Sequence, residues 1–239
     1  MNVNKLLILY SGVLTAACAV ALTSSAVANE NESNRNLGEI NVERINVREA
    51  DGTIRLVLTN SGRAPGIIWR NEDRPHPSGN RGAGLLFFNE EGTENGGLTF
   101  SGRTLPDGRV VGGGHISFDQ YEQDQVIQLT QSEAGGSRWA GLVVSDRPDA
   151  PLDFDLAVRI SQMPEGPERT AAIQRVQQEG TFGRQRLMVG KTRDRASAVL
   201  LSDAMGRPRI RMMVSPEGAS TIDFLDESGN VVRSLTPDA

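Results

Sequence analysis

The chain has 239 residues, of which 25 are basic and 30 are acidic, giving a formal net charge of −5. This length is enough for one substantial hydrophobic core or two small ones. The mild acidity argues against a nucleic-acid partner, because phosphate binding requires a basic face.

The first 28 residues are typical of an export signal. A basic residue precedes a largely apolar run over residues 6–22, and Ala26 and Ala28 form a small-x-small cleavage pattern. We expect cleavage after Ala28 and export to the periplasm. The alternative is an uncleaved anchor in the inner membrane, formed by residues 6–22. The only cysteine, Cys18, lies in this segment, so no disulfide framework is expected in the mature chain.

The remainder divides by composition. Residues 29–39 are predicted to be a polar tether, because "NENESNRNLG" has too little apolar surface to bury. Residues 40–239 are predicted to form a single β-rich domain. That domain consists of a β segment (40–151), a helical insertion (152–180) and a second β segment (181–239).

The two β segments contain short apolar runs bounded by glycine turns. Examples are "AGLLFFNEEG", "GLTFSG" and "WAGLVVSD". Runs of this length between Asp-Gly, Ser-Gly and Glu-Gly pairs are typical of antiparallel strands joined by hairpins. The predicted fold class is therefore mainly β, an antiparallel, hairpin-rich sheet or sandwich with a short inserted helical hairpin.

The helical insertion is predicted from residue spacing. In "ERTAAIQRVQQEG", Ala172, Ile173 and Val176 recur at helical spacing, with Pro167 placed to open the helix and Gly180 to end it. The preceding "FDLAVRISQM" is expected to form a shorter helix. The "PEGP" sequence between them is then the bend.

The two β segments also resemble each other. Residues 54–62, "IRLVLTNSG", align without gaps on "IRMMVSPEG" at 210–218, and "LLFFNEEG" aligns on "IDFLDESG". Asn89 and Gly92 suit left-handed turn positions. The acidic stretch "NEEGTENGG" is therefore interpreted as a shared hairpin turn, and its spacing does not match a calcium-binding loop.

One copy carries an insertion that the other lacks. After Gly62 the first copy continues with "RAPGIIWRNEDRPHPSGNR", which contains Trp69, Arg74 and His76. Long loops on a rigid sheet are common places for binding. The alternative is a solvated loop pinned by proline, with Trp69 covering the edge of the core.

A second candidate is "GGGHISFDQYEQDQV", which gathers ionisable side chains. They include His115, Asp119, Tyr121 and Glu122. A histidine beside carboxylates can perform general acid/base chemistry, or bind a metal if His76 folds nearby.

The alternation along this second stretch supports a simpler interpretation. It predicts that Ile116 and Phe118 are buried, and that His115, Ser117 and Asp119 lie on the opposite, solvated face. In that case the stretch is an exposed strand end followed by a polar turn.

The sequences "AGLLFFNEEGTENGGLTFSG" and "GGGHISFDQYEQDQ" resemble a family of uncharacterised bacterial exported or membrane-anchored proteins. The likeness extends from about Ile40 to the C-terminus and includes "VERINV", "DGTIRLVLTN" and "FLDESGNVV". The resemblance implies no activity, cofactor or site residue.

No complete catalytic constellation is present. There is no G-x-S-x-G or H-E-x-x-H motif, and two histidines cannot form a three-histidine zinc site. We therefore expect a non-enzymatic envelope module that binds an envelope protein or a small ligand. It is expected to use no cofactor, metal or catalytic residue, and to meet the membrane only through its N-terminal segment.

The predicted binding residues are Trp69, Arg74, His76, His115, Asp119, Tyr121 and Glu122. One alternative is a metal-dependent or acid/base enzyme that uses His76, His115, Asp119 and Glu122. Another is a purely structural envelope component, in which neither stretch binds anything.

Overall fold

The computed structural model describes residues 37–76 and 81–237. The predicted signal peptide or anchor and most of the predicted tether lie outside the described residues. The chain divides into two compact units, residues 1–42 and residues 43–239, and every described helix and strand belongs to the second. Among the described helices, none combines the length and apolar character that a membrane span needs.

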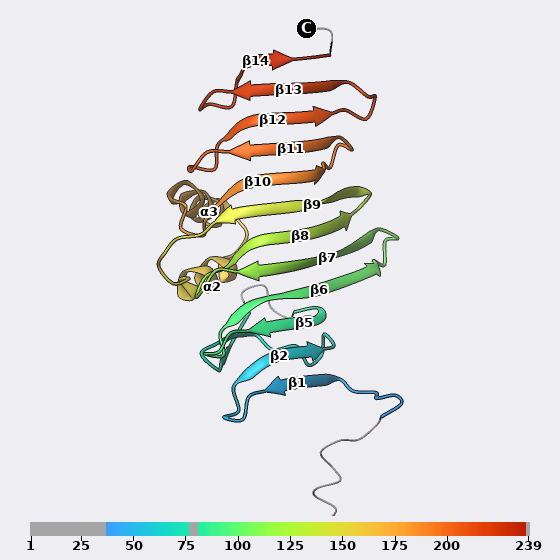
Figure 1. Cartoon of the computed structure of the whole chain (residues 1–239), viewed down its shortest axis with the longest axis vertical. Coiled ribbons are helices and arrows are strands. Elements are labelled where there is room, and N and C mark those ends of the chain that lie inside the picture. Colours follow the sequence, from blue (N-terminus) through green and yellow to red (C-terminus); the bar gives the residue numbers. More distant parts are fainter. Residues whose placement is uncertain (1–36, 77–80, 238–239) are drawn as a thin grey trace, which may run out of the picture. The chain divides into compact units, whose positions relative to one another are not determined.

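The second unit is built on one antiparallel sheet of twelve strands, in the order β1-β2-β5-β6-β7-β8-β9-β10-β11-β12-β13-β14 (Figure 1). Its strands are β1 (Arg44–Arg48), β2 (Ile54–Thr59), β5 (Ala83–Phe88), β6 (Glu94–Thr104), β7 (Val110–Asp119), β8 (Gln125–Ala134), β9 (Ser137–Asp146), β10 (Arg184–Lys191), β11 (Ser197–Ser202), β12 (Pro208–Val214), β13 (Ser220–Leu225) and β14 (Val231–Leu235). Each strand of this sheet pairs with the strand before and after it along the chain, except that β2 pairs with β5 because β3 and β4 lie between them in sequence. The mainly β prediction is confirmed, and within the described residues it takes the form of one large sheet and a separate two-stranded ribbon.

The hairpin turns explain why the strands follow one another so regularly. The side chain of Asn89 accepts hydrogen bonds from two backbone N–H groups of its own turn at 3.0 Å. Asp226 does the same at 2.9 Å. Gly92 and Gly229 occupy the left-handed region in these two turns, with φ of 69° and 84°. The prediction of a shared turn is confirmed by this common geometry.

The predicted helical hairpin is confirmed between β9 and β10. It consists of α2 (Phe154–Gln162) and α3 (Pro167–Glu179). The Asp153 carboxylate caps α2 by accepting the Leu156 N–H at 2.8 Å. Gly180 ends α3 in the left-handed conformation, with φ of 72°.

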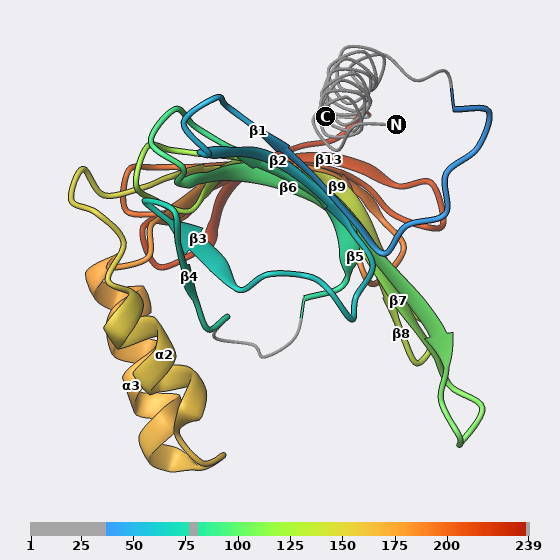
Figure 2. The ribbon, with the colours of Figure 1, turned by 90° about the horizontal axis from the view of Figure 1, so that it is seen from below.

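The insertion after β2 packs on the concave face of the sheet (Figure 2). It forms the two-stranded ribbon β3 (Ile67–Trp69) and β4 (Glu72–Arg74). Ile68 is 2% exposed and forms a hydrophobic cluster with Val57, Leu86 and Phe88 of the sheet. The interpretation of this stretch as a solvated loop is therefore wrong for β3, which is part of the core.

The position of the insertion also reverses the predicted orientation of β7. Ser117 lies on the covered face and is 2% exposed, whereas Phe118 is 51% exposed on the opposite face. The predicted burial of Phe118 is wrong. The alternation itself is correct, but the sheet is covered on the side that carries Ser117 and Asp119.

Candidate functional site

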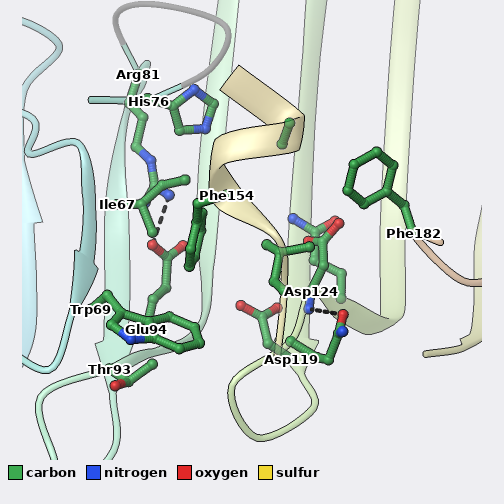
Figure 3. Close-up of a pocket in the computed structure, with 14 residues that line it drawn as sticks. Ile67, Trp69, His76, Arg81, Thr93, Glu94, Asp119, Asp124, Phe154 and Phe182 are labelled. Carbon is green, nitrogen blue, oxygen red and sulfur yellow. Dashed lines mark hydrogen bonds and ion pairs between the residues drawn. The ribbon is translucent and has the colours of Figure 1, made fainter. Parts of the chain in front are cut away.

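A cavity of about 370 Å³ opens where the insertion, the β-turns at one end of the sheet and the start of α2 meet (Figure 3). Trp69 and His76 come from the insertion, Asp119 from the end of β7 and Phe154 from α2. Phe182, between α3 and β10, also lines the cavity. With Glu94 at the start of β6, the site collects residues from five separate stretches of the chain.

Aromatic rings form much of the cavity wall. Trp69 and Phe154 meet edge to face, with ring centroids 4.8 Å apart and an interplanar angle of 82°. The guanidinium carbon of Arg74 lies 5.8 Å from the Phe154 centroid, which places this cation beside the same ring. In the view of Figure 3, Phe182 lies on the other side of Asp119 from these rings. These rings give the cavity an apolar surface for a flat or aliphatic group.

An ion pair between Arg81 and Glu94 lies deep in the cavity. The Arg81 guanidinium and a Glu94 carboxylate oxygen are 2.7 Å apart, and both side chains are almost fully buried. Burial raises the pKa of Glu94, while the charge of Arg81 acts to lower it. Glu94 therefore compensates the charge of Arg81 through Nη2, whereas Nε of Arg81 is buried without an acceptor among the described residues.

Asp119 is an acid of the site whose pKa is strongly raised. Burial raises its pKa from 3.8 to about 7, and the negative charges of Glu94 and Asp124 add to this effect. Its Oδ1 atom is buried and has no hydrogen-bond donor among the described residues. An unsatisfied buried acceptor costs about 1–3 kcal/mol, so this oxygen provides a binding position for a donor group.

Arg147 fixes the shape of the cavity next to Asp119. It donates to the backbone carbonyls of Gln125, at 2.8 Å from Nε, and of Phe182. It also forms an ion pair with Asp124 at 3.5 Å. These contacts connect the β7–β8 turn to the segment after α3. They also occupy the N–H groups of the Arg147 guanidinium.

The two histidines occupy different places on the concave face. His76 lines the cavity. His115 is not among the lining residues, and its Nδ1 lies 3.0 Å from the Thr99 hydroxyl. Burial, followed by the charge of Arg81, lowers the pKa of both imidazoles, and Asp124 acts in the opposite direction. Both rings are therefore mainly neutral at neutral pH.

Two other predicted residues lie outside the cavity lining. The exposed Tyr121 donates its hydroxyl hydrogen to Glu91 at 2.7 Å. Glu122 is buried and accepts a hydrogen bond from Arg70 Nε at 2.8 Å. The structure thus gathers Trp69, His76 and Asp119 in one cavity, with Arg74 against its aromatic wall. It does not bring His115, Tyr121 and Glu122 into that cavity.

Sequence reasoning missed several cavity residues. They are Arg81, Glu94, Phe154 and Phe182. A usable signal existed for Glu94. In the gap-free alignment of the two hairpins it stands opposite Val231, so an acid replaces an apolar residue at a strand position. The other three come from segments that only the folded chain brings together.

The described residues contain no group of three His, Cys, Asp or Glu side chains that could hold a metal ion. Comparison with protein-family models, with curated proteins and with solved structures found no match. The resemblance to a bacterial family stays a prediction.

Proposed function

We propose that this protein is an exported envelope module whose cavity binds a small cationic ligand with an apolar body. The single observation that carries the proposal is Asp119. It is a carboxyl group with an unpaired buried oxygen in a cavity lined by aromatic rings. A protonated amine would donate to that oxygen while its carbon skeleton packs against Trp69 and Phe154.

The charges around the cavity favour a cation over an anion. Arg81 is paired with Glu94, and Arg147 is held by backbone carbonyls and Asp124. Asp119 has no ion pair with an Arg or Lys side chain among the described residues. A ligand amine would supply the missing positive charge and lower the pKa of Asp119. Binding should then strengthen as the pH rises through about 7, where Asp119 ionises.

The test uses three probes of similar shape with the purified full chain at pH 8. They are 2-phenylethylamine, 2-phenylethanol and phenylacetate. We expect titration calorimetry to detect the amine in preference to the alcohol and the carboxylate. Asp119→Asn should weaken amine binding at least about tenfold, since a charged hydrogen bond contributes about 1.5–3 kcal/mol.

Tyr121→Phe is the matched control, because Tyr121 is ionisable, close in sequence and outside the cavity lining. This variant should bind the amine like the natural chain. Equal affinity for all three probes, or an Asp119→Asn variant that binds the amine unchanged, would refute the proposal.

A second candidate, acid/base catalysis by Asp119 and His76, is favoured by the pKa of about 7 for Asp119. The two functions differ in stoichiometry. A binding module removes at most one equivalent of a compound from a small-molecule envelope extract, whereas an enzyme consumes many equivalents. Consumption beyond one equivalent that disappears in Asp119→Asn would favour the enzyme.

A further inference from the structure

The convex face of the sheet, opposite the insertion, carries continuous rows of apolar side chains. One row contains a residue from every strand, from Ile45 in β1 through Leu129 in β8 to Leu235 in β14. All twelve of its members are Ile, Leu, Val or Met. A second row begins at Val47 and is apolar or glycine up to its last member, Arg233.

None of the side chains in these two rows is buried. Leu129, near the middle of the sheet, is 59% exposed, and Phe118 in the second row is half exposed. The rows expose on the order of 1,000 Å² of apolar surface, if about 150–200 Å² is taken for each fully exposed large side chain. The largest apolar patch of an ordinary monomer is about 300–600 Å².

The shape of the sheet adds a second observation. Its antiparallel strands keep nearly the same axis orientation from β1 to β14 (Figure 1). Open sheets of many strands normally accumulate twist, and flat ones are usually stabilised by stacking against another layer. On the concave side the insertion covers only part of the sheet (Figure 2). The convex side has no covering layer among the described residues.

We propose that a second copy of this chain covers the convex face, with the two sheets packed back to back. The exposed apolar area is of the same order as the roughly 800 Å² per partner that a stable interface of ordinary size buries. A second copy also has the same twelve-strand length, so a two-fold axis would match apolar rows to apolar rows. This proposal is independent of the ligand in the cavity.

The curvature fits such a pair. The sheet bends along its strands, so it forms a trough whose axis runs along the stack of strands (Figure 2). Two troughs placed back to back touch along a strip parallel to that axis, and the two rows run in that direction. Insertion of this face into lipid is less favourable, because the outer edges of β1 and β14 have no strand partner in the described sheet.

The test uses a photoreactive benzoylphenylalanine in the full chain in intact cells. It is placed at position 129 in the first row and, as a control, at position 205. Met205 is 52% exposed in the β11–β12 turn, away from both rows. We expect an adduct of two copies from position 129 and none from position 205. An adduct with lipid or with a different protein at position 129, or no adduct there, would overturn the proposal.

Charge substitutions provide a second measurement with two differently tagged full-length copies in one cell. Leu129→Lys and, separately, Val189→Lys should reduce their co-purification at least about tenfold, since each would bury an unpaired charge in the interface. Met205→Lys should leave it unchanged. Circular dichroism of each variant checks that the sheet is retained. Folded row variants that still co-purify would contradict the proposed interface.

Discussion

Asp119 links the cavity to the stability of the fold through its protonation. Its pKa is about 7 in the folded chain and 3.8 without burial, so the folded state binds the proton more tightly. Well below pH 3.8 both states are protonated and the group has no effect. Between pH 4 and 7 the unfolded state loses its proton first, so stability falls as the pH rises. Above pH 7 the folded state carries the full cost of the buried, ionised Asp119 carboxylate.

Asp119→Asn should remove this penalty. We expect the variant to be more stable than the natural chain at pH 8 by up to about 4 kcal/mol, given about 1.4 kcal/mol per unit of pKa. The gain should fall to about 0.5 kcal/mol at pH 4. Urea unfolding of the full chain at both pH values measures it.

The control for this prediction is Asp107→Asn in the β6–β7 turn. The backbone N–H of Arg109 lowers the pKa of Asp107, so its ionised form favours folding. Losing that carboxylate should not stabilise the chain at pH 8. An Asp119→Asn variant with the same gain at pH 4 and pH 8 would show that ionisation is not the cause.

At the scale of elements, β3 acts as part of the core rather than as a loop. Ile68 is buried against Val57, Leu86 and Phe88, so its truncation leaves a cavity in a small cluster. We expect Ile68→Ala to reduce the free energy of unfolding by about 2–4 kcal/mol. Met205→Ala, in an exposed turn, should change it by less than about 0.5 kcal/mol. A stability loss of similar size in both variants, measured by urea unfolding, would contradict this role of β3.

The same elements separate what the sequence could predict from what it could not. Local patterns suffice for the turn at Asn89 and for the ends of α3, because hydrogen bonds and backbone conformations within a few residues determine them. The alternation of β7 was also readable. Its buried side was not, because that depends on where the insertion packs. The sequence therefore identifies Asp119 as a candidate but places Glu94, whose charge raises the pKa of Asp119, in a hairpin turn.

At the scale of the whole molecule, the sheet is a linear stack in which most strands contact only their sequence neighbours. The exceptions are β2–β5 and β9–β10, where the insertion and the helices intervene. Such a stack can open from its ends, one strand pair at a time, as repeat arrays do. β14 pairs with β13 alone and all its residues are exposed, whereas β7 has a long partner on both sides.

Native-state hydrogen exchange of the full chain should therefore show a gradient. We expect the hydrogen-bonded amides of β1 and β14 to exchange at least about tenfold faster than those of β7 and β8, because opening an end strand breaks one interface and opening a central strand breaks two. A back-to-back partner would strengthen this difference, because it adds packing to central strands that are already paired on both sides. Uniform protection from β1 to β14 would instead mean that the sheet opens as one cooperative unit.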